Sequence, residues 1–164
     1  MTSLHPLYEK ENVVYHEDLI GSWRENGNSE TWMFKEGKDK SYRLIIFDEE
    51  TSGEFEVHMV QLGAYTFLDI LPEYRDDMNW VWMVHLIPTH SFMRVTVAND
   101  TLKIAPLDLE WFGKVYEQGK ITLEYVENDD MGLLISPTDK LQEFVVEYAE
   151  KEEAFPFEEL YRLK

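Results

Sequence analysis

The stretch "GEFEVHMVQLG", residues 53–63, carries the plainest secondary-structure signal in this sequence. Its apolar residues Phe55, Val57 and Met59 alternate with charged or polar residues. A period of two places apolar side chains on one face of a β-strand and polar side chains on the other. Gly63 ends the run, and the β-rich stretch "AYTFLDILPE" (64–73) follows at once. The two stretches therefore predict a β-hairpin.

The same signal extends in both directions along the chain. Short runs rich in β-branched and aromatic residues, separated by turn residues such as Asn99-Asp100, are typical of strands joined by hairpins. These runs predict further strands at 29–37, 41–50, 81–90, 91–100 and 101–107, and a late hairpin of 121–129 with 131–137.

Two stretches have helical spacing instead. Residues 108–119 place Trp111, Phe112 and Val115 on one helical face, with Asp108 as the expected N-cap. A second apolar face, i, i+3, i+4 and i+7 from Leu141, follows Ser136-Pro137, which predicts a helix capped by Ser136.

About eight to ten short strands joined mostly by hairpins make the protein mainly β. Open sheet edges promote aggregation, and an up-and-down barrel is the simplest closure. We therefore predict an antiparallel up-and-down β-barrel with a short helix near 108–118 and a C-terminal helix near 137–151. Residues 1–18 read as a polar N-terminal arm, and 19–164 as a single barrel domain.

Composition narrows the function classes. The chain has 15 Lys and Arg against 33 Asp and Glu, a formal charge of −18. This charge repels nucleic-acid phosphates and anionic membrane surfaces. The absence of cysteine excludes disulfides, thiolate metal ligands and cysteine nucleophiles. No run reaches the roughly 18 apolar residues of a membrane span. We expect no nucleic-acid partner and no membrane span.

Motifs for catalysis or metal binding are missing from the sequence. There is no phosphate-binding glycine loop, no Gly-x-Ser-x-Gly and no His-Glu-x-x-His. His85 and His90 are five residues apart, whereas ligands on one strand sit two apart. We expect no catalytic residues, no metal site, no cofactor and no enzymatic activity.

Gly21-Ser22-Trp23, at the first predicted strand, resembles the Gly-x-Trp signature of the lipocalins and the wider calycin group. The late helix "TDKLQEFVVEYAEK" is similar to the helix that packs on a lipocalin barrel after its last strands. The resemblance implies that Gly21 and Trp23 are structural, with Trp23 plugging the closed end of the barrel. Lipocalins pair this tryptophan with a basic residue of a late strand, for which Arg94 and Arg162 are the candidates here.

The lead-in "HPLYEKENVVYHEDLIGSW" resembles lipocalin-like domains of bacterial cell-envelope proteins. This implies a cell-envelope location, as the mature chain of a lipoprotein. The alternative is a cytoplasmic protein that starts at Met1.

A barrel of about eight strands can hold a small ligand. Its lining would come from alternate residues of paired strands, and the expected ligand-binding residues are Tyr42, Leu44, Phe55, Val57, Met59, Tyr65, Phe67 and Asp69. Asp69 lies in an otherwise apolar stretch, so its charge needs a partner. It is either a polar anchor in the cavity, beside Arg43 or Arg94, or an outward residue bonded to a loop.

Two functions fit these features. The first is a non-enzymatic, lipocalin-like binding module for a small apolar ligand, neutral or cationic because the chain is so negative. The second is a structural or protein-interaction domain whose barrel is filled. Its partner would contact residues 74–82, where Tyr74, Trp80 and Trp82 gather. The oligomeric state is open.

Overall fold

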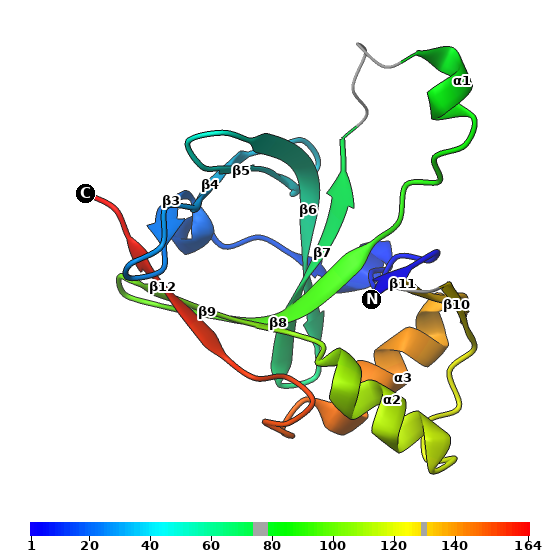
Figure 1. Cartoon of the computed structure of the whole chain (residues 1–164). Coiled ribbons are helices and arrows are strands. Elements are labelled where there is room, and N and C mark those ends of the chain that lie inside the picture. The colour runs from blue at the N-terminus through cyan, green and yellow to red at the C-terminus, as the bar shows by residue number, and fades with distance from the viewer. Residues whose placement is uncertain (74–78, 129–130) are drawn as a thin grey trace.

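The computed structural model describes residues 1–73, 79–128 and 131–164, and its largest part is a β-barrel (Figure 1). The barrel strands are β3 (Gly21–Arg24), β4 (Thr31–Glu36), β5 (Tyr42–Phe47), β6 (Ser52–Leu62), β7 (Tyr65–Pro72), β8 (Ser91–Ala98), β9 (Thr101–Pro106) and β12 (Glu158–Arg162). Within the described residues these eight strands form a closed ring, because β7 pairs with β6 and β12 lies between β9 and β3.

Each strand from β3 to β9 pairs antiparallel with the next along the chain. The turn between β6 and β7 begins at Gly63 (φ 60°), and the turn between β8 and β9 begins at Asn99 (φ 54°). A positive φ at this position matches the right-handed twist of hairpin strands, and it favours Gly and Asn. The predicted mainly β, up-and-down barrel is confirmed.

The strand that closes the barrel was not among the strands that the sequence predicted. β12 follows the C-terminal helix and pairs antiparallel with both β9 and β3. The predicted late hairpin instead becomes β10 (Tyr125–Asn128) and β11 (Met131–Leu134), which form a separate three-stranded sheet with β1 (Thr2–Ser3). Local alternation predicted strands correctly there, but pairing depends on contacts distant in the sequence.

The predicted strand over 81–90 is wrong. A short helix, α1 (Trp80–Met83), occupies its first part, and irregular chain leads on to His90. The Asn79 side chain accepts a hydrogen bond from the Val81 backbone N–H at 2.8 Å, which starts the helix. A short, nearly continuous apolar run has no regular alternation, so its periodicity cannot separate strand from helix.

The two other helices lie close to their predicted positions. In α2 (Leu109–Glu117), Asp108 caps the first turn by accepting from the Trp111 N–H at 2.7 Å. α3 (Thr138–Tyr148) begins after Pro137, and Ser136 does not cap it. The Ser136 hydroxyl instead accepts from the Glu124 N–H at 2.6 Å and so ties the segment before β10 to the helix start.

Residues 1–18 run along the barrel. After the 3-10 helix η1 (Lys10–Asn12), β2 (Val13–Val14) pairs with β6 where β5 no longer does, and η2 (Glu17–Leu19) leads into β3. β2 thereby satisfies backbone groups on the free edge of β6.

The strands separate two apolar cores. The barrel interior contains a cluster with Trp23, Phe34 and Leu68 among its members. A second cluster lies between the outer face of the barrel and the helices, and it includes Phe67 and Phe112. Phe67 and Leu68 are neighbours on β7 and point to opposite faces, as the strand period requires.

Trp23 is fully buried at the start of the first barrel strand. Its indole N–H donates to the Leu19 carbonyl oxygen at 2.9 Å. The Arg162 guanidinium lies 4.1 Å above the indole ring and donates to the Ile20 and Asp18 carbonyl oxygens. Gly21 has a φ of 138°, and a Cβ there would collide with this guanidinium. The missing Cβ of Gly21 therefore lets Arg162 of the last barrel strand, β12, pack closely against the first, β3.

We expect Trp23→Ala to lower the free energy of unfolding by about 3–5 kcal/mol, because it removes a large buried aromatic ring. Urea denaturation monitored by circular dichroism measures the loss. Trp80→Ala is the matched control: 71% of Trp80 is exposed, so its replacement should change stability by no more than about 0.5 kcal/mol. Equal losses of stability in the two variants would contradict the inference that the buried Trp23 ring stabilises the barrel.

Candidate functional site

The structure divides the eight expected ligand-binding residues between the two faces of the barrel wall. Tyr42, Leu44, Val57 and Met59 are buried in the interior cluster, and Phe55 packs at its margin. The remaining three come from β7 and do not belong to the interior: Tyr65 and Phe67 join the outer cluster, and Asp69 is on the same outer face.

The register of β6 and β7 explains this division. Met59 pairs with Leu68 and Val57 with Ile70, and paired residues share a face of the sheet. The inward residues of β7 are therefore Leu68 and Ile70. Because "YTFLDILP" is apolar on both faces, its sequence alternation does not select one. Phe67 packs edge-on against Phe155 instead, with ring centroids 6.1 Å apart.

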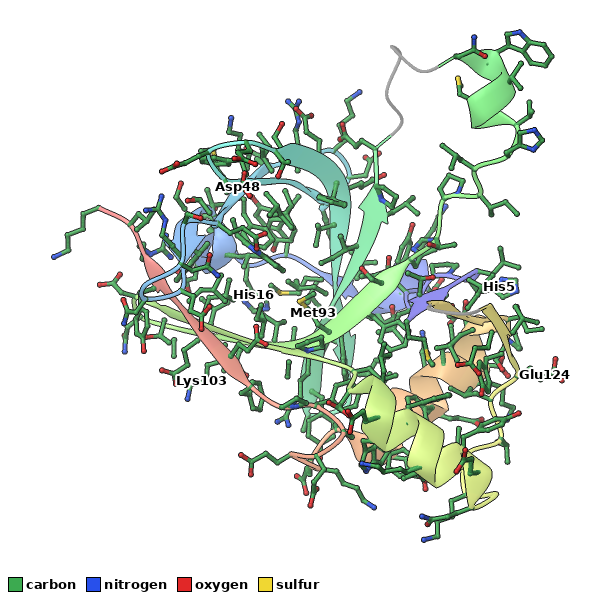
Figure 2. All side chains as sticks on the ribbon, in the orientation of Figure 1. His5, His16, Asp48, Met93, Lys103 and Glu124 are labelled. Carbon is green, nitrogen blue, oxygen red and sulfur yellow. The ribbon has the colours of Figure 1, made fainter. Side chains whose placement is uncertain are left out.

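Large side chains fill the interior that the sequence assigned to a ligand (Figure 2). The largest fully buried interior residues are Trp23, Tyr42, Phe34, Leu19, Leu44, Met59, Leu68 and Leu102. Tyr42 also carries a buried polar atom: its hydroxyl accepts from the His16 N–H at 2.6 Å and lies 3.2 Å from the His16 carbonyl oxygen. Burial raises the pKa of Tyr42 to about 12, so the phenol is neutral at physiological pH.

A pocket of about 250 Å³ lies where β7 and β8 separate. Their ladder runs from the Ile70–Ser91 pair to the Phe67–Arg94 pair and stops there. Beyond that point β7 still pairs with β6, and β8 still pairs with β9. We call this pocket the seam pocket; it is lined by His16, Asp18, Met59, Ala64, Tyr65, Thr66, Arg94, Val95, Thr96 and Val97.

The seam pocket combines an apolar base with a polar rim. Met59, Val95 and Val97 contribute to it from the interior cluster. Asp18 and His16 come from the chain around η2. The pocket therefore offers apolar surface to the body of a molecule and hydrogen-bonding groups to one end.

Arg94 borders the seam pocket, but its guanidinium is engaged in packing. It lies 5.1 Å from the ring centroids of both Tyr65 and Phe157, and it donates to the Ala149 carbonyl oxygen just after α3. These contacts fix β8 against the helix layer. The Arg94 guanidinium thus keeps its positive charge beside the pocket while it holds these partners, and Asp18 is the carboxylate of the pocket lining.

Asp69 is the centre of a second polar cluster, on the outer face of β7. The carboxylate is 1% exposed; one oxygen accepts from the Leu7 N–H at 2.6 Å, and the other lies 2.6 Å from His90 Nδ1. Neither Arg43 nor Arg94 is its partner: Arg43 pairs with Glu54. Asp69 is the outward residue bonded to a loop, and His90, which sequence reasoning did not connect to it, returns from the segment after α1.

Two more rings complete this cluster. Tyr8 stacks on His58 with centroids 4.1 Å apart, and His58 is the cross-strand partner of Asp69. Burial, followed by the Asp69 and Glu56 carboxylates, raises the pKa of Tyr8. Burial lowers the pKa of His58, and the same two carboxylates oppose that shift. Together these contacts hold the arm on the barrel wall.

No family model, curated protein or solved structure matches this chain. Across residues 1–73, 79–128 and 131–164, no group of three or more His, Cys, Asp or Glu side chains is placed to hold a metal ion. Over the same ranges, no helix is both long and apolar enough to cross a bilayer.

Asp69→Ala should lower the free energy of unfolding by about 1–3 kcal/mol, because it leaves the Leu7 N–H and His90 without their acceptor. Hydrogen exchange should accelerate at Leu7 more than at the central residues of β4. Glu49→Ala, at an exposed turn residue, is the control and should have no such effect. Unchanged exchange at Leu7 would show that the carboxylate does not hold the arm.

The lowered pKa of His58 predicts a pH dependence of stability. Below the ordinary histidine pKa of about 6.5, the unfolded chain binds a proton that the folded protein resists. Stability should therefore fall as pH drops through that value, until the folded pKa is passed. Urea denaturation of the protein and of His58→Gln at pH 7.5 and 5.5 measures this contribution. The variant should lose less stability between the two pH values, and an equal loss would contradict the role of His58.

Proposed function

We propose that the protein is a non-enzymatic binding module for a small apolar ligand, and that the ligand occupies the seam pocket. The observation that carries the proposal is the position of the pocket: two barrel strands separate, and the opening reaches Met59, Val95 and Val97 of the interior cluster. The side chains of the interior cluster occupy the barrel axis, so we place the ligand in the seam.

The size and charge of the seam pocket define the ligand class. Its volume of about 250 Å³ exceeds the roughly 150 Å³ of a cavity that binds benzene. It is therefore suited to a molecule with one or two rings or a short alkyl chain. Asp18 and Arg94 line the pocket with opposite charges, so the net charge of −18 is what favours a neutral or cationic molecule over an anion.

A lipocalin-like origin of the barrel is part of this proposal. Gly21 and Trp23 begin the first barrel strand, and Arg162 of the last strand covers the indole ring. This supports the pairing of tryptophan and basic residue that the lipocalin resemblance implies. The order of elements differs, because β12 follows α3 instead of preceding it.

The buried Asp69–His90 pair has a structural role in this proposal. An aspartate–histidine pair serves catalysis when the histidine is oriented toward a nucleophile or substrate. Here both carboxylate oxygens hold structural partners, and the His90 backbone exchanges hydrogen bonds with Ser3 at 2.7 and 2.8 Å. The Ser3 hydroxyl lies 2.8 Å from the His5 carbonyl oxygen, to which it donates. The pair therefore fastens the arm.

The filled interior favours a second candidate, a structural or protein-interaction domain. Of the partner-contact segment 74–82 that the sequence predicted for this candidate, residues 74–78 lie outside the described residues. Its side chains pack as a core that needs no ligand to complete it. The two candidates differ in whether the seam pocket binds a molecule at all.

Titration with the neutral fluorescent probe N-phenyl-1-naphthylamine tests the binding module. We expect saturable binding with a dissociation constant on the order of 10 μM, about −7 kcal/mol. Val97→Trp should fill the seam pocket and weaken binding about tenfold or more. Val126→Trp is the matched control, since Val126 is exposed on β10 and does not line the pocket.

Circular dichroism of both variants checks that each retains the fold. Equal binding by the two folded variants would place the probe elsewhere and contradict the seam pocket. No saturable binding across a panel of neutral probes would reject the binding module in favour of the filled interaction domain.

A further inference from the structure

Five exposed large apolar side chains lie close together in sequence on α1 and the residues after it. Figure 1 shows α1 projecting beyond the end of β7, away from the barrel and from α2 and α3. We call residues 79–87 the apolar tip. Its most exposed side chains are Trp80 (71%), Ile87 (68%) and Val84 (65%), followed by Val81 and Leu86.

The composition of the apolar tip is unlike that of the rest of the protein. Charged residues make up 29% of the chain, yet residues 79–89, "NWVWMVHLIPT", contain no Asp, Glu, Lys or Arg. Exposing several large apolar side chains to water at one place is unfavourable, in proportion to the apolar area exposed. A patch of this kind on a soluble surface marks an interaction site.

The distribution of apolar side chains distinguishes a bilayer from a protein groove. A helix that docks in a groove presents one apolar face and keeps the other polar. The exposed apolar side chains at positions 80, 81, 84, 86 and 87 come from both α1 and the chain after it, so they do not form the single face of one helix. An apolar surface that is not confined to one face is suited to a surrounding apolar medium. Tryptophan in addition favours the boundary between acyl chains and headgroups.

Charge decides which bilayer surface the tip can reach. The chain carries −18, so an anionic lipid surface repels it as a whole. The tip itself contributes no acidic or basic side chain other than His85, and it needs no anionic headgroup. We propose that the apolar tip inserts into the outer layer of a neutral, zwitterionic phospholipid membrane, with the barrel held outside.

Insertion at this site would be shallow. α1 has four residues, which fits an anchor in the headgroup and upper acyl region, where interfacial helices bury their apolar faces about 5–10 Å deep. Asn79 caps the helix start, and Pro88 ends the apolar run where the chain turns back toward β8. The proposal rests on the tip alone and is independent of the seam pocket.

Flotation with vesicles of pure phosphatidylcholine tests the proposal on the full chain. We expect the protein to float with these vesicles, and to float less with vesicles that contain 30% phosphatidylserine. Val84→Asp should reduce the bound fraction about tenfold, because it puts a charge into the acyl region. Val126→Asp is the matched control, since Val126 is 52% exposed elsewhere and its replacement should leave binding unchanged.

Phosphatidylcholine brominated in its acyl chains gives a second readout. It should quench part of the tryptophan emission of the wild-type chain and of Val126→Asp, but not that of Val84→Asp. No flotation with neutral vesicles would overturn the proposal. Equal loss of binding in both variants would show adsorption without a specific tip and would also overturn it. Self-association that only Val84→Asp abolishes, without vesicle binding, would assign the tip to a second copy of the chain.

Discussion

Closure of the barrel by β12 is the constraint on which the rest of the structure depends. β9 ends at Pro106 and β12 begins at Glu158, yet the two strands pair side by side. The chain between them must therefore leave the barrel wall and return to the same place. The Arg162 guanidinium fixes that return, because it covers Trp23 and binds the carbonyl oxygens just before β3. Without the backbone pairing of β12, β3 and β9 would be open sheet edges.

The segment between β9 and β12 covers the outer face of the barrel wall, so the wall is buried on both faces. α2, α3 and the small β1–β11–β10 sheet contribute to an outer core that also contains Phe67 and Phe112. β7 is consequently apolar on both faces, as strands covered on both sides are. Asp69 is the exception on its outer face, and its two short hydrogen bonds offset the cost of removing a carboxylate from water.

The seam pocket and the apolar tip both arise from how β7 and β8 are connected. β8 stays paired with β9 as far as the Ala98–Thr101 pair, whereas β7 stays paired with β6 as far as the Leu62–Tyr65 pair. The two strands therefore share only part of their length, and the chain around η2 borders the gap. At the other end of the same strands, the long connection carries α1 away from the wall. One partly paired strand pair thus produces the seam pocket at one end and the apolar tip at the other, the two places where we propose ligand binding and membrane insertion.

The sequence by itself determined the fold class and most of its elements. Alternation in "GEFEVHMVQLG", the turns at Gly63 and Asn99, and the Asp108 cap act over a few residues, so they are readable locally. The choice of the closing strand was not readable, since β12 has five residues and its partners lie far away in sequence. The inward face of β7 was hidden as well, because both of its faces are apolar. Likewise, His90 and Leu7 meet Asp69 only after the arm and the segment after α1 have docked. Tertiary structure decided these features because each depends on which surfaces, distant in the sequence, bury one another. The sequence of a single strand or helix does not specify those partners.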